Sequence, residues 1–241
     1  MFNPVQHAKS YPFSPPGHCF LYEGGDWERL DHGRLDDERL EGEGRVPVLA
    51  AGSNQSPAQL KRKYGHLTDA GVIPARRGLL HEFDVVYAAH LTGYGSVPAT
   101  FQHSPGTAVT VFVLWLDEPQ LARMHETEGN YTYDHLDGIR ITLDSGGTMG
   151  QAFAYSSKSG CLNNAGACVS LREITATDRR FQELGQVAAL TLLRDRFAPG
   201  VELDDFVRQH LDDREVHQLR TSRMSEDALP AAFARRTIAV F

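Results

Sequence analysis

The sequence is poor in cysteine and has no long hydrophobic run. Its three cysteines, Cys19, Cys161 and Cys168, are an odd number without a C-x-x-C pair, so we expect reduced thiols and no disulfide framework. No apolar run approaches the ~18 residues that a membrane-spanning helix needs, and the N-terminal stretch lacks the apolar core of a secretory signal. These absences predict a cytoplasmic protein with no membrane partner.

An excess of basic charge is also missing. The formal net charge is −7, with 24 Lys and Arg against 31 Asp and Glu. The basic runs at residues 61–63, 76–77 and 235–236 are short, which is typical of solvated faces. We therefore expect no nucleic-acid partner, because such surfaces need a concentrated basic patch.

Residues 46–60, VPVLAAGSNQSPAQL, are the stretch around which the chain is organised. The β-branched apolar run at its start predicts a short strand. Gly52, Ser53 and Asn54 then predict a sharp turn, since Gly and Asn tolerate positive φ. Ser56 followed by Pro57 predicts a helix start with a hydroxyl cap. Such a strand–loop–helix junction directs backbone N–H groups and a helix dipole at one point, where a carboxylate or an oxyanion can bind.

The residues that follow predict more strands than helices. Residues 99–103 predict a short strand, closed by a turn at Ser104-Pro105-Gly106 before the most apolar strand, 109–116. Asp117 is placed to cap a helix over 118–126, which Gly129 would end in the left-handed conformation. Further strands are predicted at residues 73–94, 133–143 and 149–155, the last two joined by a hairpin turn.

The two ends of the chain differ from this β-rich centre. Residues 1–17 are rich in proline and predict an extended arm or a disordered tail, and residues 24–45 predict a polar loop or hairpin. Helices are predicted at 178–197, 203–219 and 225–234, with Ser225 capping the last. We therefore expect an α+β protein with a curved or barrel-like sheet, divided into an N-terminal extension (1–44), a core (45–157) and a helical C-terminal region (158–241).

The ordered set of motifs in the core resembles the γ-glutamylcyclotransferase-like (AIG2-like) superfamily. The motifs are Gly52-Ser53-Asn54 after a strand, Pro98-Ala99-Thr100, the apolar strand 109–116, the pair Glu128-Gly129 after a short helix, and then Tyr133. The resemblance covers about residues 45–157. It implies a small mixed β-barrel with helices packed outside, acting on a small-molecule γ-glutamyl amide without a cofactor or metal.

The implied reaction is an intramolecular aminolysis that releases 5-oxoproline and a free amine. One carboxylate can take the proton from the attacking amine and return it to the leaving nitrogen, and ring closure needs no nucleophilic side chain. By the resemblance, Glu128 is the catalytic acid/base. The implied substrate-binding residues are Gly52, Ser53, Asn54, Tyr133 and Tyr155.

The chain departs from the family pattern at Ala51, where the family has a tyrosine before Gly-Ser-Asn. This change leaves two other functions open: a non-catalytic binding module on the same fold, or a transferase or amidohydrolase acting on another γ-linked amide. The segments outside the core could cover the pocket, set its specificity or form a homodimer contact. A buried Glu128 beside a cavity at the Gly52–Asn54 loop would favour the enzyme.

Two other groups of residues are weaker candidates. His125, Glu128 and His135 lie near one another in sequence, but their spacing is not one that metal ligands use. Ser53 has no neighbouring histidine and no G-x-S-x-G context, so we interpret it as a backbone-contact residue. We expect Glu126, two residues before Glu128, to face solvent or pack against the cavity wall.

Overall fold

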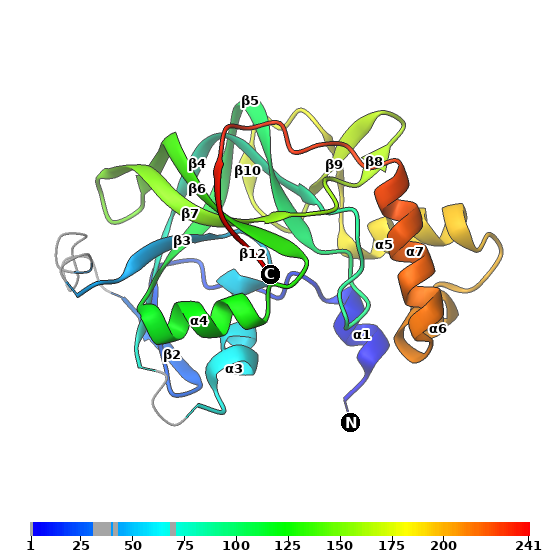
Figure 1. Ribbon diagram of the computed structural model, residues 1–241, viewed down its shortest axis with the longest axis horizontal. Coiled ribbons are helices and arrows are strands. Elements are labelled where there is room, and N and C mark those ends of the chain that lie inside the picture. Colours follow the sequence, from blue (N-terminus) through cyan, green and yellow to red (C-terminus); the bar gives the residue numbers. More distant parts are fainter. Residues whose placement is uncertain (1, 31–39, 41–42, 68–70) are drawn as a thin grey trace.

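The centre of the molecule is a closed ring of five strands. The computed structural model describes residues 2–30, 40, 43–67 and 71–241. Going round the ring, the strands are β3 (Val46–Ala50), β5 (Ala99–Leu116), β4 (Ile73–Tyr87), β6 (Tyr131–Leu143) and β7 (Thr148–Ser157). β7 returns to β3 in the parallel direction, whereas the other pairs are antiparallel. The predicted α+β class with a small mixed β-barrel is confirmed (Figure 1).

Further strands and helices surround this barrel. The outer strands are β1 (Phe20–Glu23), β2 (Asp26–Arg29), β8 (Asn163–Asn164), β9 (Ala167–Leu171), β10 (Ala176–Thr177), β11 (Gln182–Leu184) and β12 (Arg236–Val240). The helices are α1 (Pro4–Lys9), η1 (Ser53–Gln55), α3 (Pro57–Tyr64), α4 (Glu118–Glu126), α5 (Gln186–Phe197), α6 (Leu203–Asp212) and α7 (Arg214–Glu226). Within the described part of the chain, no helix is both long and apolar enough to cross a membrane.

The two faces of β3 bury different cores, because side chains alternate along a strand. Val48 and Ala50 pack in a cluster with α3 and α4, which includes Leu60 and Met124. The intervening Leu49 packs in a larger cluster that extends to the C-terminal helices. Figure 1 shows α3 and α4 on one side of the barrel and α5, α6 and α7 on another. The loop after β3 lies where these two parts meet.

β5 is one long strand, so the turn predicted at residues 104–106 is wrong. Pairing with β4 shifts register between His81 and Phe83. There Glu82 and Gly106 both have positive φ, and the Gly106 N–H donates to Glu82 Oε2 over 3.2 Å. The turn residues therefore form a bulge that bends the strand pair without ending it.

The C-terminal helices begin and end at other residues than the sequence predicts. The helix predicted at 178–197 begins only at Gln186, because Gln182–Leu184 adds to the sheet beside β9. The helix predicted at 203–219 is two helices, since Asp213 caps α7 by accepting from the Glu215 and Val216 amides.

The helix predicted at 225–234 is absent from the described structure. Ser225 belongs to the last turn of α7, and the chain then returns to the barrel as β12, antiparallel to β6. Val240 and Thr237 on β12 align with Thr132 and Asp134 on β6. Within the predicted helix, Leu229 instead forms an isolated antiparallel bridge with Cys161, so pairing with a distant residue overrides the local helical signal.

The N-terminal segment is an ordered part of the fold and not an extended or disordered arm. Asn3 caps α1 by accepting from the Gln6 amide, and the helix buries Val5 and Ala8. β1 pairs with β4 and with β2, so part of the polar stretch 24–45 is the predicted hairpin. Residues 31–39 and 41–42 of that stretch lie outside the described residues. The division at residues 44 and 157 stays a prediction.

The two helices that flank the β3 loop end of the barrel begin differently. Asp117 and Gln120 form a capping box at the start of α4, as the sequence predicts for Asp117. Ser56 precedes α3, but its hydroxyl makes no capping bond and instead donates to the Ser14 carbonyl over 3.4 Å. Gly129 has no positive φ, and α4 ends at Thr127, whose amide bonds back to the helix.

Candidate active site

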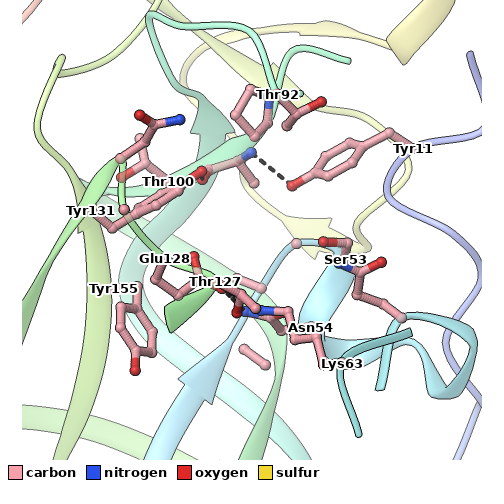
Figure 2. A pocket seen from close by; sticks show the side chains of 18 of the residues that line it. Tyr11, Ser53, Asn54, Lys63, Thr92, Thr100, Thr127, Glu128, Tyr131 and Tyr155 are labelled. Carbon is pink, nitrogen blue, oxygen red and sulfur yellow. Dashed lines mark hydrogen bonds and ion pairs between the residues drawn. The ribbon is translucent and has the colours of Figure 1, made fainter. Parts of the chain in front are cut away.

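A cavity of about 420 Å³ opens at the end of β3 (Figure 2). Five of the six residues predicted for the site line this cavity: Gly52, Ser53, Asn54, Glu128 and Tyr155. They come from the η1 loop, from the turn after α4 and from β7. The cavity therefore gathers the motifs that are separated in the sequence.

Tyr133 is the predicted residue that the structure places elsewhere. It is absent from the cavity lining and is buried against neighbouring rings. Its ring stacks on Phe153 at 4.9 Å between centroids and meets His125 edge-on at 4.8 Å. Tyr131, two residues earlier on β6, lines the cavity in its place.

Glu128 is buried, with 8% of the residue exposed, and its carboxylate is held in place. Oε1 accepts from the Asn54 side-chain amide over 2.9 Å and from Lys63 Nζ over 2.5 Å. Both recorded bonds end on Oε1, so Oε2 has no partner among the described residues. A carboxylate arranged in this way can accept a proton or an ammonium group at Oε2.

Lys63 is a site residue that the sequence reasoning missed. The run 61–63 was interpreted as a solvated face, but Lys63 is only 4% exposed. It shares the buried face of α3 with Leu60 and Tyr64, and this helical spacing is the signal that could have found it. Burial lowers the pKa of the Lys63 ammonium, an effect that Glu128 opposes.

Asn54 leaves a buried acceptor unused. Its Nδ2 donates to Glu128, whereas Oδ1 is buried and has no hydrogen-bond partner. A buried polar atom without a partner costs free energy, so its presence in a cavity wall needs an explanation, such as a bond to a ligand. Glu128 Oε2 therefore offers an acceptor to a cationic donor, with the unpartnered Asn54 oxygen buried in the same wall.

The opposite side of the cavity is lined by neutral groups. Burial raises the pKa of the Tyr11, Tyr94 and Tyr131 phenols. Burial also lowers the pKa of His90 to about 4, with a smaller contribution from His217. These groups are therefore uncharged near neutral pH. We call Tyr11, Tyr94, Tyr131 and His90 the neutral wall, and Asn54, Lys63 and Glu128 the charged wall.

Gly52 is needed for space and not for a positive φ. Its φ is −119°, contrary to the sequence prediction for the loop. A Cβ atom at this position would lie 2.3 Å from the Tyr11 phenol oxygen and 3.2 Å from Ala99 Cβ. The glycine thus lets Tyr11, from the N-terminal segment, approach the loop backbone. No motif in the sequence indicates this approach.

The weaker candidates are placed away from the chemistry. Glu126 is exposed and pairs with Arg123 over 2.6 Å, which confirms the expectation of a solvent-facing side chain. His125 Nδ1 lies 2.7 Å from the Tyr155 hydroxyl, whereas His135 Nε2 lies 3.2 Å from Gln151 Oε1. Among the described residues, no group of three or more His, Cys, Asp and Glu side chains is arranged to hold a metal ion.

Comparisons with known proteins return similarities of fold. No family model matches the chain, and no curated protein matches it. Among solved structures, it is similar to a protein named gamma-glutamyl cyclotransferase, with 12% identity and a TM-score of 0.37 over 80% of this chain and 93% of that one. It is also similar to an uncharacterized protein from Homo sapiens (14% identity, TM-score 0.36, 80% and 93% covered). A third similar structure is YkqA from Bacillus subtilis (10% identity, TM-score 0.38, 86% and 72% covered). These structures include the fold family that the residue pattern resembles.

Proposed function

We propose that this chain cleaves a γ-glutamyl amide by attack of the substrate's own α-amine on its γ-carbonyl carbon. The products are 5-oxoproline and a free amine. No protein nucleophile is required, because the attacking nitrogen and the carbonyl carbon belong to one molecule and form a five-membered ring.

The observation that supports this proposal best is the environment of Glu128. The carboxylate is buried in the wall of a cavity, held at Oε1 by Asn54 and Lys63, with Oε2 open. The unpaired Asn54 Oδ1 adds a second acceptor. Together they suit the α-ammonium group of a glutamyl substrate, which has N–H donors to satisfy.

In the proposed reaction, Glu128 carries protons from the attacking nitrogen to the leaving nitrogen. It takes a first proton from the substrate ammonium, which frees a nitrogen lone pair to attack the γ-carbonyl carbon. When the tetrahedral intermediate collapses, the carbonyl re-forms, the old amide bond breaks, and Glu128 gives this proton to the leaving nitrogen. The ring nitrogen still carries two protons, so Glu128 takes the second one and passes it to the released amine, which leaves as an ammonium ion. Lys63 and Asn54 hold the carboxylate in position through their bonds to Oε1. A positioned acid–base of this kind contributes about 10²–10⁴-fold to a rate.

The test is turnover of γ-glutamyl amino acids, γ-glutamyl peptides and γ-glutamylamines, with 5-oxoproline measured by mass spectrometry. We expect wild type to release 5-oxoproline, and Glu128→Gln to lose at least about 10²-fold in kcat. Glu126→Gln is the matched control, because it makes the same change on an exposed side chain two residues away and should keep full activity. Unfolding curves of the variants check that each one folds.

The other outcomes identify other functions. Release of glutamate in place of 5-oxoproline would indicate an amidohydrolase, in which water is the attacking group. Binding of 5-oxoproline or glutamate by wild type without turnover of any compound would favour a binding module. Full activity in Glu128→Gln would contradict the role that we assign to the carboxylate.

A further inference from the structure

The Tyr11 phenol lies in the cavity, although the N-terminal segment is far from the motifs in sequence. Its oxygen accepts a hydrogen bond from the Ala99 N–H over 2.8 Å, marked by a dashed line in Figure 2. The Ala99 and Ser53 backbones both lower the pKa of Tyr11. Burial raises this pKa by a larger amount. Tyr11 is only 3% exposed. The phenol is thus fixed between the η1 loop and the start of β5.

The Ala99 bond uses acceptor capacity of the oxygen and leaves its proton free. A phenol can accept two hydrogen bonds and donate one. The Ala99 N–H occupies one acceptor position, and no acceptor for the O–H lies among the described residues. This N–H donor polarises the phenol and makes its O–H a stronger donor.

The other phenols around the cavity have partners of their own. The Tyr131 hydroxyl donates to the Ala99 carbonyl over 3.1 Å. The Tyr155 hydroxyl lies 2.7 Å from His125 Nδ1. The Ser53 and Thr92 side chains lower the Tyr94 pKa against the larger effect of burial. Tyr11 is therefore a phenol of the described site that is held by a backbone donor and whose proton is available to a ligand.

We propose that Tyr11 donates its O–H to the γ-carbonyl oxygen of the substrate and stabilises the oxyanion that forms there. This inference rests on the proposed function. As the amine nitrogen bonds to the carbonyl carbon, the C=O π electron pair moves onto oxygen, and the negative charge meets the Tyr11 donor. The pair returns when the leaving C–N bond breaks. Tyr11 keeps its proton throughout, and Glu128 performs the proton transfers.

The division of the cavity supports this assignment. The charged wall presents acceptors, Glu128 Oε2 and Asn54 Oδ1, which suit the ammonium group. An oxyanion needs a donor, and the Lys63 ammonium is already bonded to Glu128 and to Met124 Sδ. The phenol of Tyr11 faces the same cavity.

The experiment compares Tyr11→Phe with wild type on the substrate that wild type turns over. Loss of one preorganised oxyanion donor should lower kcat by about 10²-fold or more and change KM little. Binding of 5-oxoproline, measured by calorimetry, should change as little as KM, since its ring carbonyl, like that of the bound substrate, carries no full negative charge. Tyr87→Phe is the matched control: its buried hydroxyl donates to the Leu184 carbonyl over 3.1 Å, outside the cavity lining, so kcat should not change.

Each alternative result has a distinct meaning. A kcat within about threefold of wild type in Tyr11→Phe, with wild type active, would overturn the donor role alone. A rise in kcat would also overturn the donor role. It would mean that the phenol occupies the position of the oxyanion and keeps it from the backbone amides of the Gly52–Asn54 loop. Failure of wild type both to turn over any γ-glutamyl compound and to bind 5-oxoproline would overturn the proposed function, and the role of Tyr11 with it.

Discussion

The charged wall and the neutral wall of the cavity use burial in opposite ways. On the charged wall, Lys63 and Glu128 are buried as an ion pair 2.5 Å apart, with Asn54 as a third partner. On the neutral wall, burial moves the pKa values of three phenols and of His90 away from neutrality. One wall therefore keeps charge in the interior by pairing it, and the groups of the other wall are neutral near pH 7.

This difference separates two chemical tasks. Proton transfer needs a group that can change its charge, and the paired carboxylate supplies one. Stabilising a developing negative charge needs fixed donors in dry surroundings, which neutral phenols provide without a competing counter-ion. The two walls also come from different parts of the chain, since the motif residues form the first and residues outside any motif form most of the second.

The largest effect should follow from breaking the pair on the charged wall. Lys63→Met leaves Glu128 buried without a cation, and we expect a loss of about 3–5 kcal/mol in the free energy of unfolding. Replacing both partners, as Lys63→Met with Glu128→Leu, should recover most of this loss but leave no activity. Urea unfolding and 5-oxoproline assays check both. Lys61→Met, on an exposed neighbour in α3, is the control. A single variant as stable as wild type would show that the pair is not energetically coupled.

The neutral wall should make stability fall at acid pH. In the folded protein the pKa of His90 is about 4, below its ordinary 6.5, because burial and His217 disfavour the cation. The unfolded chain then binds the extra proton, so the free energy of unfolding decreases as pH falls from about 6.5 towards 4, by about 3 kcal/mol from this residue.

His90→Phe tests this, because a residue that cannot titrate should make the pH dependence shallower in that window. His90 packs on Tyr131 and its Nδ1 lies 3.3 Å from Ser157 Oγ, so the comparison is between slopes and not absolute stabilities. His66→Asn, on an exposed histidine, should leave the slope unchanged. Equal slopes in all three proteins would mean that His90 does not resist protonation.

A substitution at Gly52 can disrupt the contact between the η1 loop and Tyr11 of the neutral wall. Gly52→Ala places a Cβ atom 2.3 Å from the Tyr11 phenol oxygen, so we expect a loss of about 1–3 kcal/mol and reduced turnover. Adding Tyr11→Phe removes the clashing atom and should restore stability without restoring turnover. Gly17→Ala, with nothing within 4 Å of the new Cβ, is the control. Thermal unfolding of wild type, Gly52→Ala, Tyr11→Phe and the double variant measures the coupling.

The smallest expected effect is a difference in N-terminal capping between α4 and α3, the two helices beside the charged wall. Asp117→Ala removes a capping box from α4 and should cost about 1 kcal/mol. Ser56→Ala precedes α3, where the hydroxyl makes no capping bond, and should cost less than about 0.5 kcal/mol. Chemical unfolding resolves this difference. Equal costs would show that the two starts are equivalent in solution.

Several elements were predictable because their signals are local. The apolar run of β3, the hairpin of β6 and β7, and the Asp117 cap of α4 each depend on neighbouring residues. The motif resemblance then indicated Glu128 and the Gly52–Asn54 loop. The errors arose where distant pairing overrode local preference. Residues 104–106 have turn chemistry but bulge within a long strand, and residues 236–240 join β6 after a predicted helix.

The sequence by itself determined the strand–loop–helix junction, the barrel class and the carboxylate, because period, capping and motif order are properties of short stretches. Only the tertiary structure decided which groups complete the cavity. Lys63 belongs to a basic run that looks solvated until α3 packs against the barrel, and Tyr11 reaches Gly52 and Ala99 only after the N-terminal segment folds across the molecule. Burial and long-range contact set the charge of these groups and the bonds available to them, and neither can be read from neighbours in the sequence.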